Sequence, residues 1–134
     1  MAVFQHHDHS IAYSLHHAPF NFDLVLLQGS QFTSDFWKPV LSDLTGQTAA
    51  AGRLLICDWY DAKVEDENLA ENFIRLVGTI GLNSVRVVAF DDAVEMVAEA
   101  QRQHPGLFDK TLFFPQGGPK GDDLTRAVRD LCQI

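Results

Sequence analysis

The sequence predicts an α/β fold, a three-layer sandwich with a mainly parallel sheet. Short apolar runs alternate with longer amphipathic runs, and this order is typical of layered α/β domains. Several of these runs end at glycine or proline, where strands and helices terminate. A chain of 134 residues provides enough apolar surface for one modest core, so we expect residues 1–134 to form a single domain in which residues 1–9 are flexible.

The strands are predicted from apolar runs of strand length. Residues 24–27 are Leu-Val-Leu-Leu, an unbroken run typical of a strand that is buried on both faces of a parallel sheet. The run at residues 85–90 has the same character, whereas the run near the N-terminus is weaker. In chain order, the predicted strands occupy residues 11–15, 23–27, 53–59, 84–90 and 110–114.

Helices are predicted where apolar residues recur at helical spacing. In the first of them the apolar residues fall on one face, Ser34 provides an N-cap, and Gly46 ends the helix. Gly81 is expected to cap the second helix, and Pro105 marks the end of the third. The predicted helices occupy residues 34–45, 68–81, 92–103 and 122–131.

The composition narrows the classes of partner and compartment. Ten basic residues against eighteen acidic ones give a formal net charge of −8, which opposes binding to nucleic acid. From the hydropathy pattern we expect no membrane span, no membrane partner and no secretory signal. The two cysteines, Cys57 and Cys132, do not suggest a disulfide framework, so we expect a cytoplasmic protein, and we expect no cofactor.

Three segments at the ends of predicted strands carry a resemblance to a known family. They are Gln28-Gly29-Ser30, Arg53-Leu54-Leu55-Ile56-Cys57-Asp58 and Ala89-Phe90-Asp91-Asp92-Ala93. In this order and register, residues 10–115 resemble the α/β-hydrolase family, which has a His-Gly turn, a strand leading to Asp-x-Arg-Gly and a nucleophile elbow at these places. The resemblance implies the N-terminal two-thirds of an α/β-hydrolase fold.

The elbow frame departs from the family pattern at its centre, where Asp91 replaces serine. A G-x-S-x-G elbow needs small flanking residues, and here they are alanines. Haloalkane dehalogenases and epoxide hydrolases of this family use aspartate at this position, so the resemblance implies Asp91 as a nucleophile candidate that attacks carbon and forms an ester. The family's histidine base follows its last strand, and no histidine follows His104 in this sequence.

These observations favour a non-catalytic binding or interaction module over an enzyme. The alternative is a small hydrolase of the esterase, dehalogenase or epoxide-hydrolase type, in which Asp91 is the nucleophile and a partner subunit supplies the base. Backbone amides near the glycine turn are expected to form an oxyanion or ligand site at the carboxyl ends of the strands. The residues expected at this site are Gln28, Gly29, Ser30, Asp58 and Asp92.

The expected partners are a small-molecule ligand and a second protein chain. The two final strands of the family have no counterpart in the sequence, so the predicted sheet has an open edge. We therefore expect a homodimer or another protein partner that covers this edge, because two-fold pairing is the commonest arrangement of soluble oligomers. The sequence does not identify the surface.

Other interpretations remain open for the acidic pair and for the glycine turn. Asp91 and Asp92 are also explained as caps of a helix that begins at Ala93. The same acidic pair resembles the strand-end aspartates of response-regulator receivers, which bind Mg²⁺. The glycine turn is also explained as a plain tight turn, without an anion site.

Two further groups have a functional and a structural interpretation. The N-terminal histidines and the acidic stretch at residues 58–67 offer cation ligands, but a flexible terminus and a solvated loop explain them as well, and we expect no metal site. Trp37, Trp59 and Phe90 are candidates for a pocket wall or for ordinary core packing.

Overall fold

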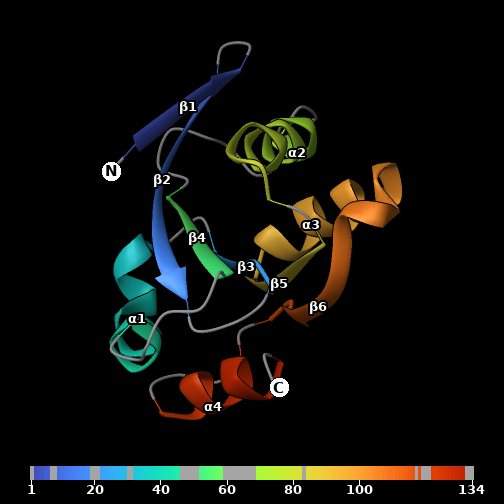
Figure 1. The fold of residues 1–134 in the computed structure, drawn as a ribbon. Coiled ribbons are helices and arrows are strands. Elements are labelled where there is room, and N and C mark those ends of the chain that lie inside the picture. Colours follow the sequence, from blue (N-terminus) through green and yellow to red (C-terminus); the bar gives the residue numbers. More distant parts are fainter. Residues whose placement is uncertain are drawn as a thin grey trace.

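A computed structural model describes residues 2–6, 9–18, 22–29, 32–45, 52–58, 69–82, 84–116, 118 and 122–131. These residues form a six-stranded sheet with the order β1-β2-β4-β3-β5-β6 (Figure 1). Strands β4, β3, β5 and β6 are parallel, whereas β2 pairs antiparallel with β4 and β1 antiparallel with β2. The strands are β1 (Ala2–His6), β2 (His9–Ala18), β3 (Leu24–Leu27), β4 (Gly52–Asp58), β5 (Val85–Phe90) and β6 (Phe108–Phe114).

Helices cover both faces of the sheet, which confirms the predicted three-layer α/β sandwich (Figure 1). Helices α2 and α3 pack on one face and α1 and α4 on the other. Consecutive residues of β3 enter opposite layers, since Leu24 belongs to the core beneath α1 and α4 and Val25 to the core beneath α2 and α3. The helices are η1 (Ser34–Trp37), α1 (Lys38–Thr45), α2 (Leu69–Ile80), α3 (Ala93–Gln103), η2 (Pro105–Leu107) and α4 (Asp122–Leu131).

The N-terminal segment contains a strand that was not predicted, while the flexibility expected for residues 1–9 stays a prediction. Strand β1 lies within it and pairs with β2 from Ala2↔Tyr13 to His6↔His9. Strand β2 is also longer than the predicted strand at residues 11–15, because it pairs with the whole of β4. The antiparallel hairpin supplies backbone hydrogen bonds that the irregular composition of this segment did not reveal.

The start of the first predicted helix also differs from expectation. Ser34 is the first residue of the 3₁₀ turn η1, and the N-cap is Thr33, whose hydroxyl accepts a 3.4 Å hydrogen bond from the Asp35 N–H. The α-helix begins at Lys38, so that Pro39 lies in its first turn, where the missing N–H costs no hydrogen bond. Proline thus fixes where the 3₁₀ turn changes to an α-helix.

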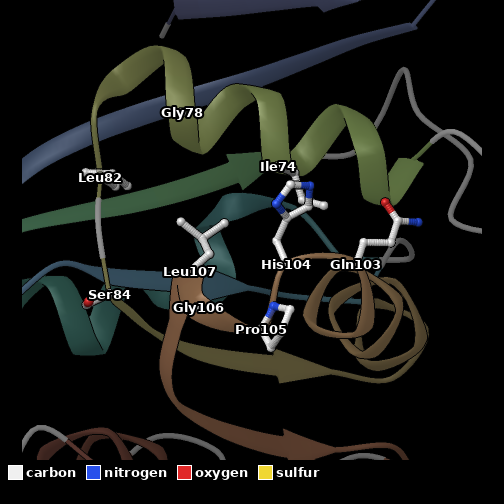
Figure 2. A pocket seen from close by; sticks show the side chains of 9 residues that line it. All are labelled: Ile74, Gly78, Leu82, Ser84, Gln103, His104, Pro105, Gly106 and Leu107. Carbon is white, nitrogen blue, oxygen red and sulfur yellow. The ribbon is translucent and has the colours of Figure 1, made fainter.

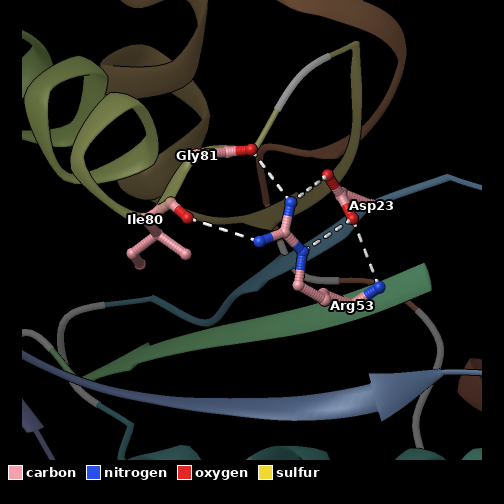
Figure 3. Close-up of polar contacts among 4 residues, drawn as sticks. All are labelled: Asp23, Arg53, Ile80 and Gly81. Carbon is pink, nitrogen blue, oxygen red and sulfur yellow. Dashed lines mark hydrogen bonds and ion pairs between the residues drawn. The ribbon is translucent and has the colours of Figure 1, made fainter. Parts of the chain in front are cut away.

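At the amino ends of the parallel strands, Arg53 joins three elements (Figure 3). Its guanidinium donates to the Asp23 carboxylate at 3.3 Å and to the carbonyls of Ile80 at 3.3 Å and Gly81 at 2.9 Å. Gly81 has a φ of 87°, and the Leu82 N–H donates to the Val77 carbonyl at 3.0 Å, which confirms the predicted glycine cap of α2. At this end of the sheet, hydrogen bonds of Arg53 therefore join β4 to the residue before β3 and to the end of α2.

Candidate functional site

The turn between β5 and α3 holds Asp91 in a left-handed conformation, with a φ of 53°. Its N–H donates to the Phe114 carbonyl at 2.8 Å, and its own carbonyl accepts from the Val94 N–H at 3.1 Å. Backbone contacts to β6 and to α3 thus hold the residue in place. This conformation is unfavourable for residues other than glycine, and aspartate tolerates it better than most because its side chain is short.

The Asp91 side chain lies directly against the backbone of Gly29. A Cβ atom placed on Gly29 would be 2.8 Å from Oδ2 and 3.0 Å from Cβ of Asp91, so a side chain there would collide with the aspartate. Gly29 follows β3, and β3 lies beside β5 with Leu27 opposite Ala89. The close approach explains why glycine occupies this position.

These two residues meet at a switch point of the sheet. Helix α1, which follows β3, packs on one face, and α3, which follows β5, packs on the other. The two chain segments thus leave neighbouring strands toward opposite faces, and in open α/β sheets this arrangement creates a crevice outside the carboxyl ends of the strands. In open α/β sheets ligands bind at such a point.

Gln28 has a structural role that sequence reasoning did not identify. Its side chain is fully buried, donates to the Cys57 carbonyl at 2.8 Å and accepts from the Trp37 indole N–H at 2.9 Å. These bonds tie the end of β3 to β4 and to η1. The side chain therefore lies in the core, and a role for the Gln28 backbone amide stays a prediction.

Asp92 does not act as the side-chain cap of α3 that the simpler interpretation expects. Asp92 stands at the N-cap position of α3 with a φ of −69°, but its side chain makes no capping hydrogen bond. Ser30 lies outside the described residues, and Asp58 ends β4 with a side chain that is not described. Of the predicted site residues, the structure brings Gly29 and Asp91 into contact.

Aromatic rings line the same end of β5 and β6. The Phe36 and Phe90 rings lie 5.0 Å apart, the Phe90 and Phe114 rings 4.8 Å apart and the Phe32 and Phe36 rings 5.3 Å apart. Phe90 and Trp37 are buried core residues, which favours the core interpretation for both, whereas Phe32 is 38% exposed. Phe32 is close to the site, because its N–H donates to the Gly29 carbonyl at 2.9 Å.

The predicted turn at Gly29 is thus present. Two residues that border it, Phe32 and Phe114, were not predicted. Phe114 meets Asp91 through its backbone carbonyl, from a strand 23 positions further along the chain. No local pattern signals such a contact, since it depends on β6 pairing with β5. Trp59, the other aromatic candidate, lies outside the described residues.

A groove lies at the opposite end of β5 from Asp91. It has a volume of about 530 Å³ and lies between α2 and the end of α3 (Figure 2). His104 stands on its wall at the C-cap of α3, and its N–H donates to the Ala100 carbonyl at 2.9 Å. The groove contains none of the predicted site residues; its lining is Ile74, Gly78, Leu82, Ser84, Gln103, His104, Pro105, Gly106 and Leu107.

In the described part of the chain, no three histidine, cysteine, aspartate or glutamate side chains are placed to hold a metal ion. The N-terminal His7 and most of the acidic stretch at residues 58–67 lie outside that part. None of the helices in the described ranges has the length and apolar character needed to cross a membrane.

The sequence matches no protein-family model and no curated protein. Its structure is similar to an α/β-hydrolase enzyme from a Medee basin deep-sea metagenome library, with a TM-score of 0.66 and 14% identity over 84% of this chain and 43% of that one. An α/β-hydrolase fold protein from Burkholderia ambifaria matches with a TM-score of 0.65 and 21% identity over 96% of this chain and 49% of that one.

A third similar structure is AqDC, in complex with its product, which recognises and cleaves the ring of the Pseudomonas quinolone signal. The TM-score is 0.68 and the identity 14%, over 98% of this chain and 57% of that one. This chain therefore has the α/β-hydrolase fold, and it spans about half the length of these structures. At such low identity the likeness concerns the fold alone.

Proposed function

We propose that this chain is a non-catalytic ligand-binding module with the α/β-hydrolase fold, and that its small-molecule ligand binds against Asp91. The observation that carries the proposal is the turn at Asp91, which is left-handed and presses the carboxylate onto Gly29. An aspartate in this conformation costs on the order of 1 kcal/mol, and strain of this kind is concentrated at functional sites.

The surroundings of Asp91 support a particular class of ligand. Within the described part of the chain, its carboxylate accepts no hydrogen bond, although its backbone groups are paired. An ionised carboxylate accepts hydrogen bonds and donates none, so the matching ligand group is an N–H or O–H donor. The exposed Phe32 beside Gly29 offers apolar surface. We infer an apolar small molecule with a donor group.

The positions of the histidines support binding over catalysis. The histidines that the structure describes lie on β1, on β2 or at the end of α3. Strand β2 is three strand spacings from β5, or about 14 Å, and His104 lies one helix length from Asp91, or about 16 Å. A general base must come within hydrogen-bond reach of the water that it activates.

The second candidate is a small hydrolase, and the geometry of the elbow is the observation that favours it. Asp91 stands at a strained strand-to-helix turn, as a nucleophile elbow requires. In this reading an Asp91 oxygen attacks an alkyl carbon, the carbon–halogen bond breaks, and halide leaves as an ester forms. Water then hydrolyses the ester with the help of a base that a partner subunit supplies.

One experiment separates the two candidates. The chain, its Asp91→Asn variant and an Asp123→Asn control on the exposed face of α4 are assayed against esters, lactones and alkyl halides, and their intact masses are measured afterwards. We expect no turnover and no alkyl adduct in any of the three proteins. Turnover or an adduct that is present in the parent and in Asp123→Asn but lost in Asp91→Asn would establish the hydrolase instead.

A further inference from the structure

Strand β6 forms one outer edge of the sheet, and in the described ranges it pairs with β5 alone. The Phe114 carbonyl accepts from the Asp91 N–H on the β5 side, so the backbone groups of Phe114 point toward β5. Because the direction alternates along a strand, Thr111 and Phe113 direct their N–H and C=O groups away from β5. This edge therefore offers a ladder of donors and acceptors to another strand.

We propose that a second copy of this chain occupies the edge, with the two β6 strands antiparallel about a two-fold axis at Thr111. Two-fold symmetry makes paired edge strands antiparallel, and each copy then presents the same surface to the other. The pairing would join two six-stranded sheets into one continuous sheet. The choice of a second copy as the occupant rests on the charges beside the edge.

Lys110 and Asp130 are the charges that favour this occupant. Lys110 is exposed on β6, on the face toward α4, because it stands two residues before Leu112, which packs against the core beneath α4. Asp130 is exposed on α4 and lines an apolar groove of about 310 Å³ together with Leu112. Neither has an ion pair with another described residue.

The two-fold arrangement brings these charges together. With Thr111 opposite Thr111, Lys110 of each copy lies opposite Leu112 of the other, beside the groove that holds Asp130. Two Lys110–Asp130 pairs form across the axis, which is charge complementarity that a single chain supplies to its own copy. A lysine on an edge strand ordinarily discourages pairing, but here a carboxylate is placed to receive it.

Other registers of the same strands are less favourable. Centring the axis on Lys110 sets two lysines opposite each other, which is repulsive. Centring it on Leu112 or Phe113 draws Pro115 into the ladder, where it lacks the N–H that the partner strand needs. If one β6 strand is shifted by a single residue against the other, backbone groups that point away from β5 in one copy lie opposite groups that point toward β5 in the other. No ladder of hydrogen bonds then forms. The axis at Thr111 avoids all three problems.

The test is the mass of the 134-residue chain in solution, measured by light scattering and sedimentation over a range of concentrations. We expect a dimer. Lys110→Asp and Asp130→Lys should each weaken it by at least about tenfold, and the double variant, in which the charges are exchanged, should restore it. Lys38→Asp, with the same charge change on α1, should leave the dimer unchanged.

Thr111→Pro tests the backbone ladder separately. It removes an N–H that points away from β5, so the hydrogen bonds between β5 and β6 remain, and we expect a folded monomer. Circular dichroism of each variant verifies folding, and the charge exchange remains decisive where the proline variant does not fold. A monomeric parent chain overturns the proposal, and it is the result expected if another protein covers β6. A dimer that none of these changes weakens also overturns it.

Discussion

Strand β5 is bordered at each end by a non-glycine residue in the left-handed region, and the two ends differ in how their polar groups are used. At the amino end Ser84 has a φ of 50°, and nearby Arg53 is bonded to Asp23 and to carbonyls at the end of α2. At the carboxyl end Asp91 presses against Gly29, and in the described residues its carboxylate accepts no hydrogen bond. Internal pairing marks the stabilising end, and a partly exposed carboxylate marks the end that we propose for a ligand.

Gln28 tests this comparison of the two ends of β5, because it stabilises the fold although it lies at the carboxyl end, where we propose that a ligand binds. Replacing it in Gln28→Leu leaves the buried Trp37 indole N–H without its acceptor and removes the amide that donates to the Cys57 carbonyl. We expect the free energy of unfolding to fall by about 2 to 4 kcal/mol, of which about 1 to 3 kcal/mol comes from the unsatisfied indole N–H and about 1 kcal/mol from the lost hydrogen bond to the Cys57 carbonyl. Urea denaturation measures the loss, and the exposed Gln103→Leu serves as the control. A loss no larger than that of the control would contradict the structural role.

Arg53 tests the stabilising end in the same way. Arg53→Met keeps an unbranched side chain but removes the guanidinium that donates to Asp23 and to two helix-end carbonyls, while the backbone N–H of residue 53 still donates to Asp23 at 3.2 Å. Since Arg53 is one-third exposed, we expect a smaller loss, about 2 to 3 kcal/mol. The control is Arg75→Met, whose partner Glu71 is an exposed helical neighbour, and its cost should stay below about 0.5 kcal/mol. Equal losses in both variants would show that the Arg53 cluster contributes no more than a surface ion pair.

The paired substitutions Asp91→Gly and Ser84→Gly have the smallest expected effects and compare the two ends directly. Glycine adopts a positive φ without the steric cost, so each variant should be more stable by about 0.5 to 1 kcal/mol. Ligand binding should be lost in Asp91→Gly and retained in Ser84→Gly. Thermal denaturation and a binding assay on the same samples check both expectations. Binding that survives in Asp91→Gly would remove the functional difference between the ends.

Local patterns predicted the elements that long-range pairing later joins. The apolar runs of β3 and β5 and the glycine cap at Gly81 follow from residues that are close in sequence, so they could be predicted. Strand β1 could not, because its order depends on the register with β2. The α-helix begins at Lys38, after the 3₁₀ turn that Thr33 caps, and this division depends on where Pro39 permits an α-helix.

The site was predicted only as far as the elbow. Asp91 followed from a turn pattern, and Gly29 from its place after a strand, but the contact between them depends on β3 and β5 being neighbours. Gln28 was expected beside the ligand through its backbone amide, and its side chain was not expected to make two hydrogen bonds, to residues 9 and 29 positions away, that hold it in the core. Hydrogen bonds between residues so far apart in the sequence cannot be predicted from a local pattern.

The most direct test of the account is the location at which small molecules bind. The backbone amides of the ¹⁵N-labelled chain are followed by NMR while a library of apolar compounds with N–H or O–H donors is added, and the screen is repeated on Asp91→Asn. The account predicts that the compounds that bind shift the amides of Gly29, Phe32 and Asp91 and that these shifts vanish in the variant. Compounds that instead shift Ser84 and His104, at the amino end of β5, and bind Asp91→Asn equally well would contradict it.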